Sequence, residues 1–189
     1  MRQRVGIVVG ISGVGKTWLL NKVRAAIPMQ ILSASTLIRE SLAQKEEQPT
    51  PQDDLRARCI DDNQAALIEA FNRCIDPDTT LVILDAHVII DTPDGLAHVS
   101  SDVFRKIDPD FMVFIKDEPR RIRRNRERDA RRLRPDRSVD FLTKQQRVAI
   151  AAARDISDNL SIPIYFVNGG DDPELTRVLS SLQEVEPDV

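Results

Sequence analysis

The stretch GISGVGKT, residues 10–17, determines how the rest of the chain is interpreted. It matches the phosphate-binding pattern G-x-x-x-x-G-K-[ST] at Gly10, Gly15, Lys16 and Thr17. An apolar run comes directly before it, and the helix-compatible segment KTWLLNKVRAA begins inside it. Glycines let backbone N–H groups point inward around phosphate oxygens, and a helix N-terminus adds its positive end. The pattern therefore predicts an ATP site, with a glycine-rich turn and an unrelated lysine as the alternative.

Each position of this loop has an expected role. Lys16 is expected to reach the β- and γ-phosphates of ATP, and the Thr17 hydroxyl to ligate Mg²⁺. The run LVILD ends in Asp85, whose carboxylate can hold the same Mg²⁺ directly or through water. Besides Gly10, the backbone expected to hold the donor phosphates belongs to Gly13, Val14, Gly15, Lys16 and Thr17.

Five short apolar runs are typical of strands that are buried on both faces, as in parallel sheets. They cover residues 4–9, 29–33, 81–85, 111–116 and 162–167. Segments with helical spacing lie between and after them, notably 55–74, 139–160 and 175–182. This alternation predicts the α/β class, a P-loop NTPase fold with a parallel sheet flanked by helices and right-handed crossovers. We interpret residues 43–54 and 91–95 as loops.

The composition favours a single globular domain over residues 1–189, with 41% hydrophobic and 30% charged residues. No apolar run approaches the length of a membrane span. The basic and apolar N-terminus lacks a small-residue cleavage site after it, so we interpret it as a buried strand of a cytoplasmic protein. Small nucleotides are the expected partners. A membrane partner is not expected, nucleic acid is disfavoured, and self-assembly is left open.

The stretch RRIRRNRERDARRLRPDR, residues 120–137, has ten arginines and three acidic residues. Its net charge is +7, so with a total of −3 the other 171 residues sum to −10. A helix is expected here, with Asp117 as its N-cap, Pro119 in its first turn and Pro135 at its end. One basic band on an acidic body favours a local role, such as gripping phosphate with planar guanidinium groups. A solvated helix face or a nucleic-acid arm are the alternatives, the latter disfavoured because aromatics make up only 4%.

Two stretches are candidates for a second pocket that binds the phosphate acceptor. In LSASTLIRE, Ser33 and Thr36 supply hydroxyls at a helix N-terminus, and Arg39 follows one turn later. In DDLRARC, Arg56 or Arg58 opens a long helix, although an exposed helix face would look the same. An arginine-rich site without an evident base fits a phosphate acceptor better than an alcohol, because a phosphate is already anionic at pH 7.

Together these motifs resemble the archaeal-type adenylate kinases and the related eukaryotic adenylate kinases with a nuclear role. The resemblance runs almost from end to end of the chain. It rests on GISGVGKT, the helix start at Thr36, DLR at 54–56, DAH at 85–87, TPDG at 92–95, DPD at 108–110, R-x-R-D-A-x-R-x-R at 126–134 and IPIYFVNGG at 162–170.

The resemblance implies a nucleoside monophosphate kinase fold with a five-stranded parallel core. Residues 34–76 would form the monophosphate-binding helical segment, and residues 118–138 a short arginine-rich lid. The residues that it places on phosphates are Arg126, Arg132 and Arg134. It also places Asp85 and His87 near Mg²⁺ and the acceptor, and the loop at Asn168 near the donor base.

This chain also departs from the family at identifiable positions. Asn125 stands where the family often has the first of two adjacent arginines in the lid helix. Trp18 follows the loop threonine, where a small residue is commoner. The loop at 43–54 is short and offers few groups to recognise a base.

The sequence therefore predicts Mg²⁺-dependent transfer of the ATP γ-phosphate to a nucleoside monophosphate, with AMP favoured. The expected catalytic residues are Lys16, Asp85, Arg126, Arg132 and Arg134; Thr17 and Asp85 hold the metal; Ser33, Thr36, Arg39, Arg56 and His87 bind the acceptor. Arg120, Arg121 and Arg128 are expected on a solvated face. The alternatives are a small-molecule kinase with another acceptor and a nucleotide-dependent RNA-binding or assembly protein.

Overall fold

The computed structural model describes residues 2–45, 60–92, 94–129 and 135–184. Five strands form one parallel sheet in the spatial order β2-β3-β1-β6-β7. In that order the strands are β2 (Gln30–Ser33), β3 (Leu81–Asp85), β1 (Arg4–Val9), β6 (Phe111–Lys116) and β7 (Ile164–Asn168). The predicted α/β fold is confirmed, and three of the five predicted strands have the expected bounds. The other two differ: β2 begins one residue later than expected, and β7 begins two residues later and ends one residue later.

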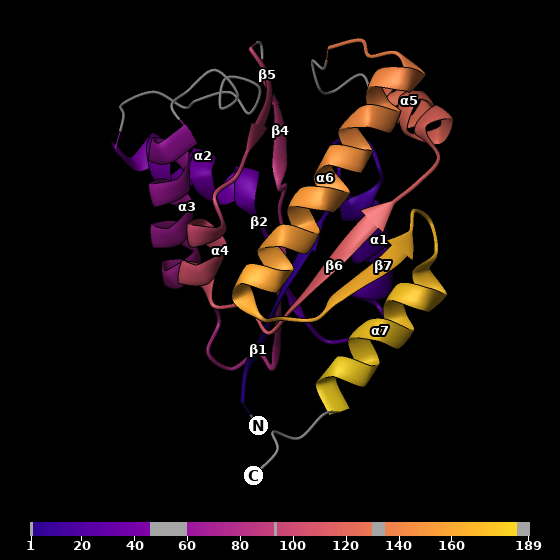
Figure 1. The fold of residues 1–189 in the computed structure, drawn as a ribbon. Coiled ribbons are helices and arrows are strands. Elements are labelled where there is room, and N and C mark those ends of the chain that lie inside the picture. Colours follow the sequence, from indigo (N-terminus) through magenta and orange to yellow (C-terminus); the bar gives the residue numbers. More distant parts are fainter. Residues whose placement is uncertain (1, 46–59, 93, 130–134, 185–189) are drawn as a thin grey trace.

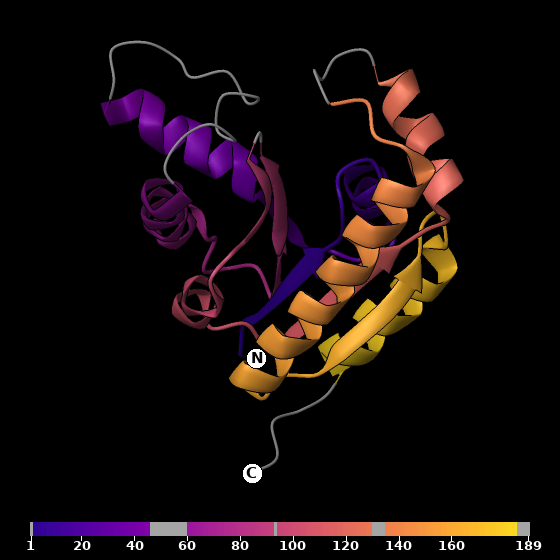
Figure 2. The same ribbon diagram turned by 45° about the horizontal axis from the view of Figure 1, so that its top comes forward.

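Seven helices cover the sheet in the described part of the chain. They are α1 (Lys16–Val23), α2 (Ala34–Lys45), α3 (Ile60–Cys74), α4 (Ser101–Ile107), α5 (Pro119–Arg128), α6 (Val139–Leu160) and α7 (Asp172–Glu184). Helix α6 crosses in front of the sheet in Figure 1, and α1 lies behind it. Helices α2, α3 and α4 gather on one side of the molecule, while α5 lies on the other side, next to the upper end of α6 (Figures 1 and 2).

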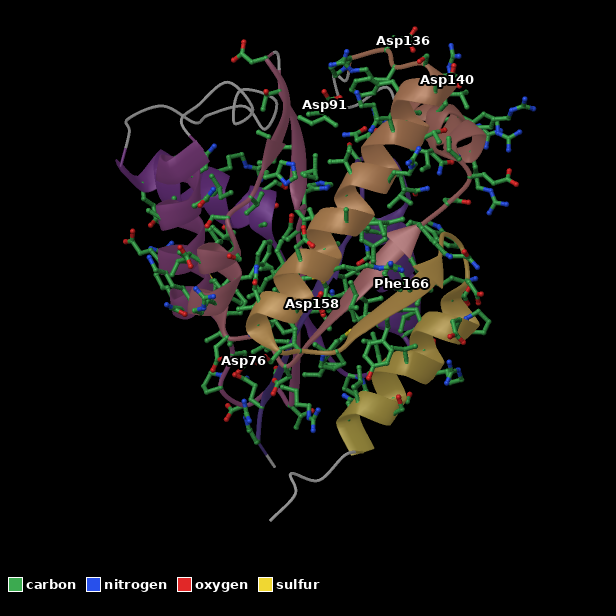
Figure 3. The ribbon with its side chains drawn as sticks, viewed as in Figure 1. Asp76, Asp91, Asp136, Asp140, Asp158 and Phe166 are labelled. Atoms are coloured by element: carbon green, nitrogen blue, oxygen red, sulfur yellow. The ribbon has the colours of Figure 1, made fainter. Side chains whose placement is uncertain are left out.

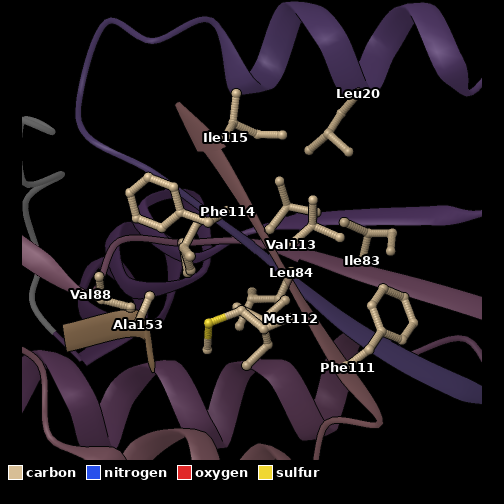
Figure 4. Close-up of a cluster of buried hydrophobic side chains, with 14 of the residues drawn as sticks. Leu20, Ile83, Leu84, Val88, Phe111, Met112, Val113, Phe114, Ile115 and Ala153 are labelled. Carbon is tan, nitrogen blue, oxygen red and sulfur yellow. The ribbon is translucent and has the colours of Figure 1, made fainter. Parts of the chain in front are cut away.

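The central strands form the core because each is covered on both faces. The side chains of Phe111, Met112, Val113, Phe114 and Ile115 are fully buried. Figure 4 shows Val113 and Ile115 directed toward the helix that carries Leu20, and Met112 directed toward Ala153 of α6. Alternate residues of one strand thus pack against helices on opposite faces, which explains why the sequence is apolar throughout.

Two further strands were not predicted. Strands β4 (Ile89–Thr92) and β5 (Gly95–His98) form a separate antiparallel hairpin, in which Thr92 pairs with Gly95. The interpretation of residues 91–95 as a loop is therefore wrong at both ends, because residues 91 and 92 belong to β4 and residue 95 belongs to β5. Each strand is only four residues long and the turn residues dominated the pattern, so the alternation of buried and half-buried positions in β4 was too short to recognise.

An ion pair fastens this hairpin to the start of α6. Arg137 donates from Nε and Nη2 to the two carboxylate oxygens of Asp91, at 3.2 and 2.9 Å. Asp91 is buried, and Figure 3 shows it on the hairpin beside the upper end of α6. The Arg137 guanidinium also lies 4.4 Å from the centre of the Phe141 ring. The last arginine of the basic stretch is therefore a structural clamp.

The arginine-rich helix is shorter than expected. Its N-cap is Glu118 rather than Asp117, and Pro119 occupies the first turn as predicted. The helix ends at Arg128, well before Pro135, because Asp129 leaves the helical conformation. The basic stretch is thus not one continuous helix as far as Pro135.

Some predicted residues lie outside the described part of the chain. They are Arg56, Arg58, Arg132 and Arg134, together with most of the loop at 43–54. None of the helices that the structure describes is both long and apolar enough to cross a membrane.

The contact between β1 and β6 gives a stability prediction. A Cβ added at Gly6 would collide with the Phe111 ring and lie 3.0 Å from Ile83 Cδ1. Both neighbours are fully buried, so Gly6→Ala should lower the free energy of unfolding by about 1–3 kcal/mol, measured by urea denaturation. Adding Phe111→Leu should recover part of that loss, because it removes the colliding ring atoms. If the double variant loses as much free energy of unfolding as the two single variants together, that result would contradict this packing.

Candidate active site

A cleft of about 930 Å³ opens at the carboxyl ends of the central strands. Its walls come from the loop after β1, the start of α2, the end of β3, helix α5 and the loop after β7. Ligands of open α/β sheets bind at this edge, and the volume suits a small-molecule ligand. Eight of the sixteen residues predicted to act on a nucleotide line this cleft, and three others lie outside the described residues.

The loop at residues 10–17 has the backbone that a phosphate site requires. Gly13 and Gly15 adopt positive φ angles of 88° and 95°, and Gly15 is the N-cap of α1. No side-chain cap covers the N-terminus of α1, so its first N–H groups face the cleft. The N–H of Val14 donates to Ile11 O at 3.3 Å and helps to shape the loop, so its role toward the donor phosphates stays a prediction.

The Lys16 ammonium is buried where three segments meet. Nζ donates to Gly10 O at 3.1 Å and lies 3.6 Å from Asp85 Oδ1 and 3.5 Å from His87 Nδ1. The same His87 nitrogen lies 2.7 Å from Gly10 O. The lysine is only 6% exposed, and a buried ammonium is stable only with such partners. These contacts hold it at the floor of the phosphate loop.

Thr17 and Asp85, the predicted metal ligands, lie side by side. The Thr17 hydroxyl donates to Asp85 Oδ2 at 2.9 Å. One hydroxyl and one carboxylate are hard oxygen donors of the kind that Mg²⁺ takes, with the rest of its octahedron left to phosphates and water. The residues present therefore fit this ion.

Helix α5 is docked onto the phosphate loop by two side chains. Arg126 Nε donates to Ser12 O at 2.8 Å, and its Nη2 donates to Gln145 Oε1 at 3.2 Å. Asn125 Nδ2 donates to Gly13 O at 3.1 Å. Arg126 was predicted to touch phosphate, whereas here its guanidinium holds the loop backbone. The close approach needs a glycine, because a Cβ at Gly13 would lie 2.6 Å from Arg126 Cγ.

Two arginines expected on an outward face line the cleft instead. Arg121 and Arg128 share one face of α5 with Asn125, at the spacing i, i+4 and i+7, and all three border the cleft. Both arginines stay exposed to solvent, but on the side where a ligand would lie. The family motif drew attention to other positions, and with arginines on nearly every face of α5 the sequence did not single these two out. Arg120 is exposed and does not border the cleft within the described residues.

The predicted acceptor residues are only partly brought together. Ser33 and His87 line the cleft, and the hydroxyl of Ser33 lies 3.2 Å from that of Ser35, which sequence reasoning missed. Thr36 and Arg39 lie farther along α2, outside the cleft wall that the structure describes. On the donor side Asn168 ends β7, and the two residues that follow it, Gly169 and Gly170, form the wall.

Asp117 is a cleft residue that the sequence signalled only as a helix cap. It follows β6 as Asp85 ends β3, so both carboxylates stand at the same edge of the sheet. Its side chain is 6% exposed, and Oδ1 accepts from the Glu118 N–H at 2.8 Å. Burial raises the pKa of this carboxyl above its ordinary value of 3.8, against the opposing effects of that hydrogen bond and of Arg121, 3.5 Å away.

Comparisons with known proteins agree with this geometry. The family model described as "AAA domain" matches residues 9–143. An adenylate kinase of Thermoplasma acidophilum is 30% identical over 164 residues, covering 84% of this chain and 86% of that protein. An adenylate kinase of Thermococcus onnurineus is 26% identical over 190 residues, covering 96% and 94%. A shikimate kinase structure from Bacteroides thetaiotaomicron has a TM-score of 0.59 at 15% identity, covering 96% and 99%, and shares the fold.

The raised pKa of Asp117 predicts a pH effect on stability. Because the folded protein binds this proton more tightly than the unfolded chain, ionisation of Asp117 costs folding free energy as pH rises above 3.8. Asp117→Asn removes that cost, so the variant should gain stability relative to the wild type between about pH 4 and about pH 7, measured by urea unfolding.

Asp172→Asn serves as a control of opposite sign. The hydrogen bond from Lys22 lowers the pKa of Asp172, so the stability it contributes is fully present above its ordinary value of 3.8 and is lost only as pH falls below that value. Asp172→Asn should therefore be less stable than the wild type by an amount that stays nearly constant between about pH 5 and about pH 7. Parallel slopes for the two variants would contradict the assignment of a raised pKa to Asp117.

Proposed function

Because this chain belongs to the AAA-domain family and to the archaeal-type adenylate kinases and related P-loop nucleoside monophosphate kinases, we propose that it transfers the γ-phosphate of ATP to AMP. Membership of this family shows that the chain is a phosphotransferase. The identity of the acceptor, AMP, is our proposal. One observation carries the proposal. A single cleft joins the phosphate loop and Asp85 to serine hydroxyls on one side and to arginines of α5 on the other.

The donor side would be formed by α1 and the loops around it. Lys16 and the backbone N–H groups at the start of α1 would bind the β- and γ-phosphates. Thr17 and Asp85 would hold Mg²⁺, which neutralises phosphate charge when it is bound. The Thr17–Asp85 hydrogen bond supports this role, because it places the two oxygen donors together at 2.9 Å. The base would lie toward the loop that follows Asn168.

The acceptor side would receive the phosphate of AMP. Ser33, Ser35 and His87 line the cleft opposite the arginines of α5 and would bind that phosphate or the sugar beside it. Thr36, Arg39 and Arg56 remain predicted acceptor residues. Thr36 and Arg39 lie outside the described cleft wall, and Arg56 lies outside the described residues. A phosphate oxygen of AMP would attack the γ-phosphorus, and the bond from that phosphorus to the bridging oxygen of ATP would break. Both products are ADP.

This reaction needs charge compensation rather than a base. The attacking phosphate is anionic at pH 7, so no proton has to be removed from it. Negative charge on the transferring group would be balanced by Lys16 and by the arginines that border the cleft, Arg121 and Arg128. Arg126, Arg132 and Arg134 remain predicted contributors. Helix α5, docked on the phosphate loop, would also limit the access of water that would otherwise hydrolyse ATP.

An assay of ADP formation from ATP and AMP tests the activity. Lys16→Ala should lower turnover by about a thousandfold, because it removes the cation nearest to the predicted phosphate site. Lys106→Ala is the matched control, since this exposed lysine lies on α4 away from the cleft, and its turnover should be within about twofold of the wild type. ATP hydrolysis at an equal rate without AMP would contradict the proposal. If a panel of acceptors shows that another molecule is phosphorylated while no ADP forms from AMP, the chain is still a kinase but AMP is not its acceptor.

A second comparison tests the two faces of α5. Arg128→Ala should lower kcat about tenfold or more, because a charge-assisted contact with phosphate would be lost. Arg120→Ala removes another exposed arginine of the same helix and should leave kcat unchanged. Equal losses in both variants would indicate an effect of net charge rather than a contact in the cleft.

A further inference from the structure

Trp18 occupies an unusual environment for its size. Among the described residues, it is the large hydrophobic side chain that stays exposed, at 58%. It lies in the first turn of α1, directly after Thr17, and lines the cleft. An exposed indole on the wall of a ligand cleft offers a large apolar face that gains free energy when a ligand covers it.

The orientation of the Trp18 ring is restricted by a neighbouring cation. Lys22, one turn along α1, places Nζ 5.1 Å from the centre of the Trp18 ring. The same Nζ donates to Asp172 Oδ1 at 2.7 Å, and Asp172 is the first residue of α7. A cation over one face of an indole restricts the ring without occupying the other face. The structure therefore keeps the ring oriented while leaving much of its surface free.

The position of Trp18 along the helix indicates which part of a ligand it would meet. Lys16 and Thr17 point to the inner end of the cleft, where Asp85 and His87 lie. The wall beyond them is the loop at Gly169, where a Cβ would lie 3.0 Å from Val14 O and 2.6 Å from Asp117 Oδ2. The Lys22–Asp172 ion pair joins the helix of Trp18 to the segment directly after this loop.

We propose that Trp18 is the surface against which the sugar and base of the donor nucleotide pack. The inference rests on the proposed function in one respect, namely that ATP is the donor with its terminal phosphates at Lys16 and Thr17. A triphosphate anchored there would have its nucleoside half outside the phosphate loop but within the cleft, whose wall includes Trp18, Gly169 and Gly170. Stacking or edge contact with the indole would then add affinity that the phosphates do not provide.

The chain contains a single tryptophan, so its fluorescence reports on this residue alone. ATP added without AMP should change the emission of Trp18 in a saturable way. Inorganic tripolyphosphate, which has the phosphates but no nucleoside, should compete with ATP while changing the emission much less. Equal emission changes for the two ligands would overturn the inference, and so would ATP binding by calorimetry with no change in emission.

Substitutions provide the second measurement. Trp18→Ala should raise the Kd for ATP about tenfold and leave the Kd for tripolyphosphate unchanged, whereas Trp18→Phe, which retains an aromatic face, should recover most of the affinity. The side chain is exposed, so neither variant should lower the thermal midpoint appreciably. An equal loss of affinity for both ligands would assign Trp18 to the shape of the phosphate loop and overturn the inference.

The same proteins separate this inference from the proposed function. If Trp18→Ala binds ATP as tightly as the wild type while the wild type forms ADP from ATP and AMP, the inference fails and the function stands. If ATP binding depends on Trp18 but no ADP forms from AMP, the inference stands and the proposal that AMP is the acceptor is wrong.

Discussion

The site depends on the buried ammonium of Lys16 and the oxygens that surround it. This one group contacts Gly10 at the end of β1, Asp85 at the end of β3 and, through its position in the chain, the start of α1. A buried cation would be costly without these partners, so the loop, the two strands and the helix are fixed relative to one another. These contacts would fix the predicted phosphate site before any ligand arrives, so that binding would not have to order it.

The arginine-rich stretch divides into groups with different tasks. Arg137 clamps the β4–β5 hairpin through Asp91, and Arg126 holds the carbonyl of Ser12. Arg123 pairs with Glu127 within the helix, at 3.0 Å. Arg121 and Arg128 are left to border the cleft. The described arginines of this stretch thus differ in what they contact, although the stretch as a whole has a net charge of +7.

The fold could be predicted because its signals are local. Strands covered on both faces are apolar at every position, and a phosphate loop needs its glycines in a short contiguous pattern. The cleft residues Trp18, Ser35 and Asp117 gave no such signal, since their importance comes from which elements meet. The orientation of α5 was also unpredictable in detail. Its sequence offers arginines on nearly every face, and the burial of Ile122 together with the contacts of Asn125 and Arg126 selects the face that meets the cleft.

The docking of α5 bears directly on how the loop would bind an anion. The carbonyl of Ser12 and the N–H of Gly13 belong to the same peptide group, so a guanidinium that donates to the carbonyl polarises the N–H on the opposite side. The next peptide is held at both ends, by Asn125 on the Gly13 carbonyl and by Ile11 on the Val14 N–H. The Ser12–Gly13 peptide is thus a stronger hydrogen-bond donor, and the orientation of the Gly13–Val14 peptide is fixed. The family often has an arginine at position 125, whereas the neutral amide found here supports the loop without bringing a further positive charge to it. In this chain the lid helix would therefore contribute to phosphate binding through the backbone of the loop as well as through its own arginines.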